Sequence, residues 1–296
     1  MAERVGVVGL GLMGSALSAA LLRAGFEVQG CDIDPARAEE LKGRGGHPAS
    51  SPRGAAAGAR FAVLSLLHSG IVREVCLGRD GLAEGAGEGL IVIDTSTSRP
   101  EDSAQIAREL RERGVAFLDA SLSGTSRDAW ERNLVAMVGG EAGDFERARP
   151  LLAAFARSVY HLGPSGAGAR TKLIVNLVLG LNRLALAEGL VLGMKAGMEM
   201  ETLLAVLKDS AAYSRAMDQR GERMVRADYG SPLSRVRQHH KDVRLILEQG
   251  RRFGAPTLLS AVHQQVLQAA EAGGLAEADT SAIIEVLRRF AGIPSR

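Results

Sequence analysis

The feature that most constrains the fold of this chain is a glycine-rich segment close to its start. Apolar residues typical of a strand run into the pattern Gly9-x-Gly11-x-x-Gly14, and an apolar run with helical spacing follows. A strand that turns through such glycines into a helix is the phosphate-binding unit of dinucleotide-binding sheets. Gly9 permits the tight turn, Gly11 lets the backbone approach a pyrophosphate, and Gly14 allows close helix–strand packing. Because the first helical N–H groups would face the phosphates, we expect dinucleotide contacts at Gly9, Gly11, Leu12, Met13 and Gly14.

An acidic residue after the next apolar stretch indicates which dinucleotide is bound. Residues 26–31 are typical of a second strand, and Asp32 follows them. A carboxylate about 20 residues beyond the glycine turn accepts hydrogen bonds from the adenosine ribose hydroxyls and repels a 2′-phosphate. The sequence therefore predicts NAD in preference to NADP. The alternative is that Asp32 merely opens a turn with Asp34-Pro35.

Strand and helix patterns alternate through the first half of the chain. Apolar runs predict further strands at 61–67, 90–94, 115–119 and 134–140, and helical patterns lie at 36–42, from 50, at 71–77, from 100 and at 144–156. Such alternation predicts βαβ units and a parallel, doubly wound sheet. Ligands bind at the carboxyl ends of strands in such sheets, so polar residues after strands are site candidates: Ser65, 95–98 and 121–126.

The pattern becomes almost purely helical beyond residues 163–166, a Gly-Pro-Ser-Gly linker. We therefore predict a domain at 1–162 and a helical domain at 163–296, with one short doubtful strand near 159–160. Helices are expected near 169–195, 200–209, 213–226, 239–253, 257–272 and 279–290. The first of these is long and apolar but contains Arg183 and Glu188, which favours a buried core helix over a membrane span. One small domain could not cover so much apolar surface, so a second subunit is expected against it.

Composition excludes several classes of function. The net charge is only +2, which gives no electrostatic case for binding nucleic acid or a membrane. The two cysteines, Cys31 and Cys76, form neither a disulfide framework nor a metal site. A strand pattern begins almost at once, which leaves no room for a signal peptide. We expect a cytoplasmic protein with reduced thiols.

Three polar segments could carry chemistry. Serine hydroxyls and loop N–H groups at 121–125, after a strand ending at Asp119, could hold a small carboxylate or hydroxyl; a simple polar turn is the alternative. Lys172 and Asn176 share a helix face, and an ammonium there could give a proton to an alkoxide or, as an amine, take one from an alcohol. A lysine beginning an apolar helix can also simply extend to solvent.

The third segment, 235–242, is locally basic and could bind an anion or simply begin a solvated helix. It contains Lys241. Its adjacent histidines, His239 and His240, would lie on different helix faces, which argues against a shared metal.

Five segments, 9–14, 94–97, 119–124, 166–176 and 241–242, occur in the order found in one enzyme family. Over essentially its whole length the chain resembles the β-hydroxyacid dehydrogenases, the group of 3-hydroxyisobutyrate dehydrogenase and tartronate semialdehyde reductase. The resemblance implies an α/β N-terminal Rossmann domain, with a doubly wound parallel sheet. It also implies an all-α C-terminal domain of the 6-phosphogluconate dehydrogenase type, and pairing as homodimers or homotetramers through this helical domain.

The resemblance also implies residue roles. Lys172 would be the catalytic acid/base and Asn176 would orient the substrate. The substrate would also meet Ser123, Gly124, Thr125 and Lys241, and the cofactor would meet Leu66, Ser96, Asp32 and Lys241. The family usually has proline at the positions of Ser121 and His68, and glycine or alanine at that of Thr125. We therefore form the hypothesis that Thr125 hydrogen-bonds a polar substrate; roles for Arg127, His239 and His240 stay open.

These observations predict an NAD-dependent oxidoreductase that interconverts a small 3-hydroxy carboxylic acid and its semialdehyde. An imine reductase on the same scaffold is one alternative, although those enzymes lack a lysine at the position of Lys172. A non-catalytic dinucleotide-binding interaction protein is the other.

Overall fold

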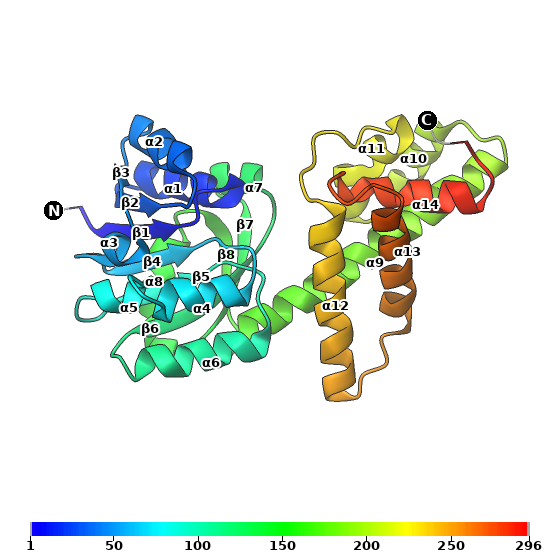
Figure 1. The fold of residues 1–296 in the computed structure, drawn as a ribbon. Coiled ribbons are helices and arrows are strands. Elements are labelled where there is room, and N and C mark those ends of the chain that lie inside the picture. The colour runs from blue at the N-terminus through cyan, green and yellow to red at the C-terminus, as the bar shows by residue number, and fades with distance from the viewer. Residues whose placement is uncertain (1, 295–296) are drawn as a thin grey trace. The chain divides into compact units, whose positions relative to one another are not determined.

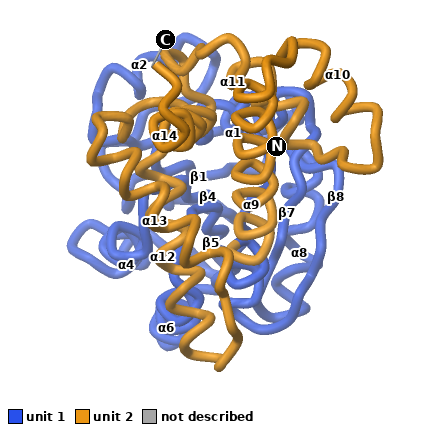
Figure 2. The backbone as a smooth tube through the Cα atoms, turned by 90° about the vertical axis from the view of Figure 1, so that its right-hand side faces the viewer, with its two compact units in different colours: residues 1–172 blue, residues 173–296 orange. Residues whose placement is uncertain are grey.

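The computed structural model describes residues 2–294, which divide into two compact units, 1–172 and 173–296 (Figure 2). The linker lies between strand β8 (Ala156–His161) and helix α9 (Ala167–Lys195). The division between the units falls later than the linker, because the first turn of α9 is bonded to the sheet of the first unit.

The first unit is built on an eight-stranded sheet (Figure 1). Its spatial order is β3 (His47–Pro48), β2 (Glu27–Cys31), β1 (Arg4–Val8), β4 (Phe61–Leu64), β5 (Ile91–Asp94), β6 (Ala116–Ser123), β7 (Leu134–Gly139) and β8. Within residues 2–294 the pairs are parallel except β6 with β7, which is antiparallel. The prediction of a parallel sheet is thus confirmed for all but this pair. The connection between β6 and β7 is too short for the crossover that a parallel pair needs.

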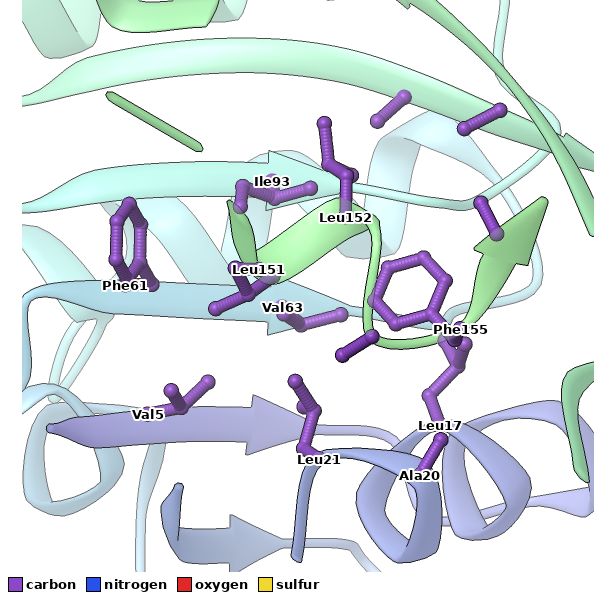
Figure 3. Close-up of a cluster of buried hydrophobic side chains, with 14 of the residues drawn as sticks. Val5, Leu17, Ala20, Leu21, Phe61, Val63, Ile93, Leu151, Leu152 and Phe155 are labelled. Carbon is purple, nitrogen blue, oxygen red and sulfur yellow. The ribbon is translucent and has the colours of Figure 1, made fainter. Parts of the chain in front are cut away.

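Helices cover both faces of this sheet. Successive residues of a strand point to opposite faces, and in β4 Phe61 and Val63 face one cluster while Ala62 and Leu64 face the other. Figure 3 shows the first cluster, where Leu17 and other residues of α1 and α8 meet the strands. Helices α1 (Leu12–Arg23), α7 (Ser126–Trp130) and α8 (Ala142–Leu152) contribute to it, whereas α3 (Pro52–Ala56), α4 (Ser69–Leu77), α5 (Leu82–Gly85) and α6 (Pro100–Arg111) cover the opposite face.

Local helix signals act as the sequence indicates. Helix α2 (Pro35–Gly43) begins where the Asp34 side chain accepts a hydrogen bond from the Ala36 N–H and Pro35 takes the first helical position. Ser51 caps α3 in the same way. Such caps satisfy N–H groups that have no partner inside the helix, so a few neighbouring residues decide where these helices start.

Strand β6 is longer than expected. The predicted strand at 115–119 with a loop at 121–125 is wrong, because β6 continues to Ser123 and pairs with β7 there. Ser121 and Leu122 are buried inside this ladder. The backbone N–H groups of this stretch therefore belong to a sheet, and the side chains of Ser121 and Ser123, two residues apart, point to the same face of it.

The second unit is helical, apart from one isolated bridge between Arg235 and Asp279. After α9 come α10 (Met200–Asp209), the π-helical turn η1 (Met217–Gly221), α11 (Glu222–Arg226), α12 (Val236–Phe253), α13 (Leu258–Ala272), the 3-10 turn η2 (Thr280–Ala282) and α14 (Ile283–Phe290). Helix α9 is long and apolar enough to cross a membrane by length and composition, as core helices of soluble proteins also are. Leu173, Leu186 and Leu190 of α9 belong to the hydrophobic core of this unit.

Candidate functional site

Two glycines of the first loop are required by the fold itself. Gly9 has φ +89°, and its N–H donates to the Cys31 carbonyl at 2.9 Å, which ties the loop to β2. A Cβ at Gly14 would collide with the Gly9 carbonyl oxygen, and one at Gly9 with the Ser65 carbonyl oxygen. The turn and the close contact of α1 with β1 therefore exist only with these glycines.

Gly11 differs, because the protein itself has room for a side chain there. Its φ of −64° suits any residue, and a Cβ would meet only Arg37 Nη1 at 3.4 Å. No side chain in the described residues caps the start of α1 at this position. The open space and the uncapped helix N–H groups of Leu12 and Met13 together fit a phosphate group.

Asp32 lies at the carboxyl end of β2, beside this loop. Its carboxylate accepts hydrogen bonds from the Leu10 N–H at 2.6 Å and the Asp34 N–H at 2.9 Å. Arg37 Nη1 lies 3.4 Å from the same carboxylate, and the Asp32 side chain is only 4% exposed. Asp32 thus both shapes the glycine loop and places a negative charge next to it.

Three exposed aliphatic side chains surround the same edge of the sheet. Leu12, Ile33 and Leu67 are all solvent-exposed, and they follow the neighbouring parallel strands β1, β2 and β4. Exposed apolar groups at strand ends suit the flat faces of an adenine or a nicotinamide ring. Sequence reasoning missed Ile33, and it placed Leu67 inside the strand predicted at 61–67, which is wrong in its end because β4 stops at Leu64.

A buried hydrogen-bond network joins the ends of β4, β5 and β6. The Leu66 N–H donates to Ser96 Oγ at 2.9 Å, and the Ser96 N–H donates to Asp94 Oδ1 at 2.9 Å. Ser121 Oγ lies 3.4 Å from the Ser96 carbonyl oxygen. Burial raises the pKa of Asp94 to about 6, against hydrogen bonds from Ser96 and Ser98 that lower it. Leu66 and Ser96, two residues that we expect at the cofactor, are therefore joined by a direct hydrogen bond.

Thr125 caps helix α7. Its hydroxyl accepts from the Asp128 N–H at 3.3 Å, and the Thr125 N–H donates to Asp128 Oδ2 at 2.7 Å, which completes a capping box. The hydroxyl also donates to Asp128 Oδ2 at 2.7 Å. Gly124 before it has φ +133°. The hydroxyl hydrogen of Thr125 is thus held by Asp128, a structural task that the comparison with family positions did not indicate. Ser123 ends β6.

Lys172 and Asn176 lie one turn apart on α9. The start of this helix is bonded to Asp119 of β6, whose carboxylate accepts from the Gly166 N–H at 2.7 Å and the Ala169 N–H at 2.8 Å. Sequence reasoning treated Asp119 only as a strand end.

In the second unit, Asn176 is buried and held by α12. Its Nδ2 donates to Asp242 Oδ2 at 2.9 Å, and Lys241 Nζ lies 3.4 Å from Asp242 Oδ1. One turn further along α9, a Cβ at Gly180 would meet the rings of His239 and His263. The absent side chain of Gly180 lets α12 and α13 pack closely on the helix that carries Asn176.

The remaining candidates have local partners. His240 points away from His239, with Nδ1 3.0 Å from Glu271 Oε1. His68 Nδ1 accepts from the Ile71 N–H at 3.4 Å and caps α4. Arg127 pairs with Glu131 on the surface at 2.8 Å. Among residues 2–294, no group of three His, Cys, Asp or Glu side chains is arranged to hold a metal ion.

Comparison with known proteins places this arrangement in a family. The NAD binding domain of 6-phosphogluconate dehydrogenase matches residues 4–163, and the NAD-binding domain of NADP-dependent 3-hydroxyisobutyrate dehydrogenase matches residues 166–287. The chain belongs to the β-hydroxyacid dehydrogenase family. It is an oxidoreductase that uses a nicotinamide dinucleotide.

Relatives of this dehydrogenase match it along nearly its whole length. L-threonate dehydrogenase of Cupriavidus necator is 33% identical, over 99% of this chain and 98% of its own. 2-(Hydroxymethyl)glutarate dehydrogenase of Eubacterium barkeri is 32% identical, over 98% and 96%. The crystal structure of 3-hydroxyisobutyrate dehydrogenase from Salmonella typhimurium superposes with a TM-score of 0.89 at 30% identity, over 96% of this chain and 99% of that one. An imine reductase from Pseudomonas sp. shares the fold at a TM-score of 0.64 and 20% identity, so the relatives favour hydroxyacid chemistry over imine reduction.

Proposed function

We propose that this dehydrogenase oxidises a small 3-hydroxy carboxylic acid to its semialdehyde or ketone, and catalyses the reverse reduction, with Lys172 as the acid/base. The observation that supports this most is the arrangement on α9. Lys172 and Asn176 lie on one face, the helix start is bonded to Asp119, and Asn176 is bonded to Asp242. An amino group and an amide in fixed positions are what proton transfer to and from a hydroxyl needs.

Each residue has a distinct part in this proposal. A bound nicotinamide dinucleotide supplies the hydride acceptor or donor. As a neutral amine Lys172 takes the proton of the substrate hydroxyl, and as an ammonium it returns a proton to the carbonyl oxygen. Asn176 Nδ2 carries two hydrogens and donates one of them to Asp242, so the other would be donated to the oxygen of the substrate hydroxyl, whose own hydrogen goes to Lys172.

We assign the rest of the substrate to polar groups from two segments. Ser123 and the backbone at Gly124 hold one side of it, and Lys241 neutralises its carboxylate. The capping box leaves Thr125 to shape this segment through α7. A carboxylate held by an ammonium and by hydroxyl or N–H donors gains charge-assisted hydrogen bonds, which orient it more strongly than neutral ones.

We infer that NAD is preferred over NADP. Asp32 carries a negative charge at the end of β2, beside the loop of Gly9 and Gly11, and would repel a 2′-phosphate. Arg37 lies 3.4 Å from Asp32 and is the residue that could counteract this repulsion. Titration calorimetry with NAD and NADP tests the preference. In Asp32→Ala the dissociation constants of NAD and NADP should differ less than in the wild-type protein. If the wild-type protein binds NADP more strongly than NAD, the inferred preference for NAD is wrong.

We also infer that the enzyme forms a homodimer or homotetramer in the cytoplasm. Ile174, Val178 and Leu192 are exposed along α9, and Leu258 and Leu259 along α13, more apolar surface than an isolated helical unit usually leaves uncovered. Cys31 and Cys76 are buried free thiols, the state of cysteine that a reducing cytoplasm maintains. Sedimentation equilibrium tests the oligomeric state, and a monomer would show that the inferred homodimer or homotetramer is wrong.

The reaction is tested by measuring NADH formation by the purified protein with NAD, and NADPH formation with NADP. The panel contains 3-hydroxyisobutyrate, 3-hydroxypropionate, glycerate, serine, threonate, 2-(hydroxymethyl)glutarate and 4-hydroxybutyrate, in which the hydroxyl lies one carbon further away. Saturable turnover of at least one 3-hydroxy acid, faster than that of 4-hydroxybutyrate, is expected. No turnover across the panel with NAD binding intact would favour the non-catalytic alternative.

A further inference from the structure

A buried carboxylate in the first unit is bonded to the start of the helix that carries Lys172. Asp119 is 1% exposed, and its two oxygens accept separate hydrogen bonds, Oδ1 from the Gly166 N–H at 2.7 Å and Oδ2 from the Ala169 N–H at 2.8 Å. N–H groups in the first turn of a helix have no partner within that helix. Asp119 supplies this partner from the middle of a strand rather than from the residue before the helix.

Glycines let this helix start approach the sheet closely. A Cβ at Gly168 would collide with the carbonyl oxygens of Asp119 and Met137, and one at Gly139 would lie 2.6 Å from Asp119 Oδ1. Gly166 has φ +95°, a conformation that L side chains rarely adopt. The helix start therefore lies close to the backbone of β6 and β7, within hydrogen-bond distance of the Asp119 carboxylate.

We propose that Asp119 is a positioning residue for Lys172: by fixing the first turn of α9 on β6, it sets where the amino group stands along the helix face. The proposal rests on the function assigned above to Lys172. Lys172 follows Ala169 by less than one helical turn, so a displaced first turn displaces Lys172 directly. Misplacement of a catalytic group by about 1 Å can cost about 10²-fold in rate.

A neighbouring residue offers a matched comparison. Asp94 of β5 is the register partner of Asp119, is equally buried, and is the same residue type. Burial raises the pKa of both carboxyls to about 6, so both are ionised at pH 7.5. Asp94, however, accepts hydrogen bonds from Ser96 and Ser98. The two carboxylates therefore hold different parts of the site, the cofactor loop and the helix of Lys172.

The experiment compares Asp119→Asn with Asp94→Asn at pH 7.5, using the best substrate of the panel. An asparagine keeps the shape but turns an NH2 group towards one of the two donors. We expect Asp119→Asn to lower kcat about 10²-fold with the dissociation constant of NAD changed less than twofold. Asp94→Asn should act mainly on the KM for NAD. The proposal would be overturned if Asp119→Asn kept the wild-type kcat. It would also be overturned if both variants changed kcat and the KM for NAD in the same proportion.

A second measurement does not depend on turnover. Amide hydrogen exchange at Gly166 and Ala169 should accelerate at least about tenfold in Asp119→Asn and stay unchanged in Asp94→Asn, because the carboxylate that accepts from these two N–H groups is that of Asp119. If the wild-type protein turns over no panel substrate, the assigned function fails while exchange still decides whether Asp119 holds the helix. If Asp119→Asn does not fold, Asp119→Ser, which leaves room for water at the two N–H groups, is measured instead. Unchanged hydrogen exchange at Gly166 and Ala169 in a folded variant would contradict the proposal that Asp119 holds the start of α9.

Discussion

Two buried aspartates, one in each unit, show different ways of keeping a charge inside a protein. Asp119 in the first unit is held by backbone N–H groups, and burial outweighs these bonds and raises its pKa to about 6. Asp279 in the second unit is also fully buried, yet its pKa is lowered. Burial acts against ionisation there too, but Arg220 Nε lies 3.1 Å away and hydrogen bonds from Ser281 and Leu233 add to its effect.

The difference lies in where the partners come from. In the first unit, glycine turns and strand ends bring backbone donors to the carboxylates. In the second unit, buried side chains from segments far apart in the sequence pair with one another, as Arg220 does with Asp279 and Asn176 with Asp242. Backbone donors partly solvate a charge, whereas an opposite charge compensates it. The second unit should therefore be the more sensitive one to loss of a single charged side chain.

The largest effect on stability is expected at Arg220. Arg220→Met leaves Asp279 buried and uncompensated, which costs about 3–5 kcal/mol in the free energy of unfolding. The double variant Arg220→Met with Asp279→Leu should recover most of this loss. In the first unit, Asp94→Asn removes a buried charge and leaves no opposite charge without its partner. It should lower the free energy of unfolding by about 1 kcal/mol or less. Urea unfolding of the four proteins checks this, and equal costs at Arg220 and Asp94 would remove the distinction between the units.

An intermediate effect is expected from pH. Burial, with Arg183 and His240 nearby, lowers the pKa of His263 from 6.5 to about 4. The unfolded chain thus binds a proton more readily, so the stability contributed by neutral His263 is complete above pH 6.5 and is lost as the pH falls towards 4. At pH 5 the loss is about 2 kcal/mol. His263→Gln should remove this part of the acid sensitivity in unfolding at pH 7.5 and 5.0; an unchanged pH dependence would show that folding does not lower the pKa of His263.

The smallest effect is expected at Thr125. Loss of its capping hydrogen bonds in Thr125→Ala should cost about 1 kcal/mol, and Thr125→Ser should retain most of the stability. The ranking of substrates is the second readout, with Thr125→Gly included. If Thr125→Ala or Thr125→Gly reorders the panel while Thr125→Ser does not, the hydroxyl meets substrate as the family comparison suggested, and capping is only part of its role.

What the sequence predicted well depends on neighbouring residues. The roles of Gly9 and Gly14 follow from the spacing of glycines within one loop. Asp34 caps a helix that starts at the next residue. The alternation of apolar runs was enough for the sheet and its covering helices. These features follow from backbone conformation and local periodicity, which a single sequence contains.

What the sequence did not predict depends on pairing across the fold. Strand β6 extends past Asp119 because β7 pairs with it, and only the folded sheet shows that pairing. Thr125 was assigned by its position in a family motif, while its hydroxyl bonds to Asp128. The contact of Asn176 with Asp242 joins segments 66 residues apart. No local pattern marks the carboxylate that holds the start of α9.

The most direct test of the account compares two lysines of the same helix. Lys172→Ala removes the proposed acid/base, and Lys195→Ala removes an exposed lysine at the far end of α9. Initial rates are measured with the best panel substrate, and NAD affinity by calorimetry. The account predicts that Lys172→Ala loses about 10²–10⁴-fold in turnover with NAD affinity unchanged, while Lys195→Ala behaves as wild type. Near-normal turnover in Lys172→Ala would contradict the assignment of Lys172 as the acid/base.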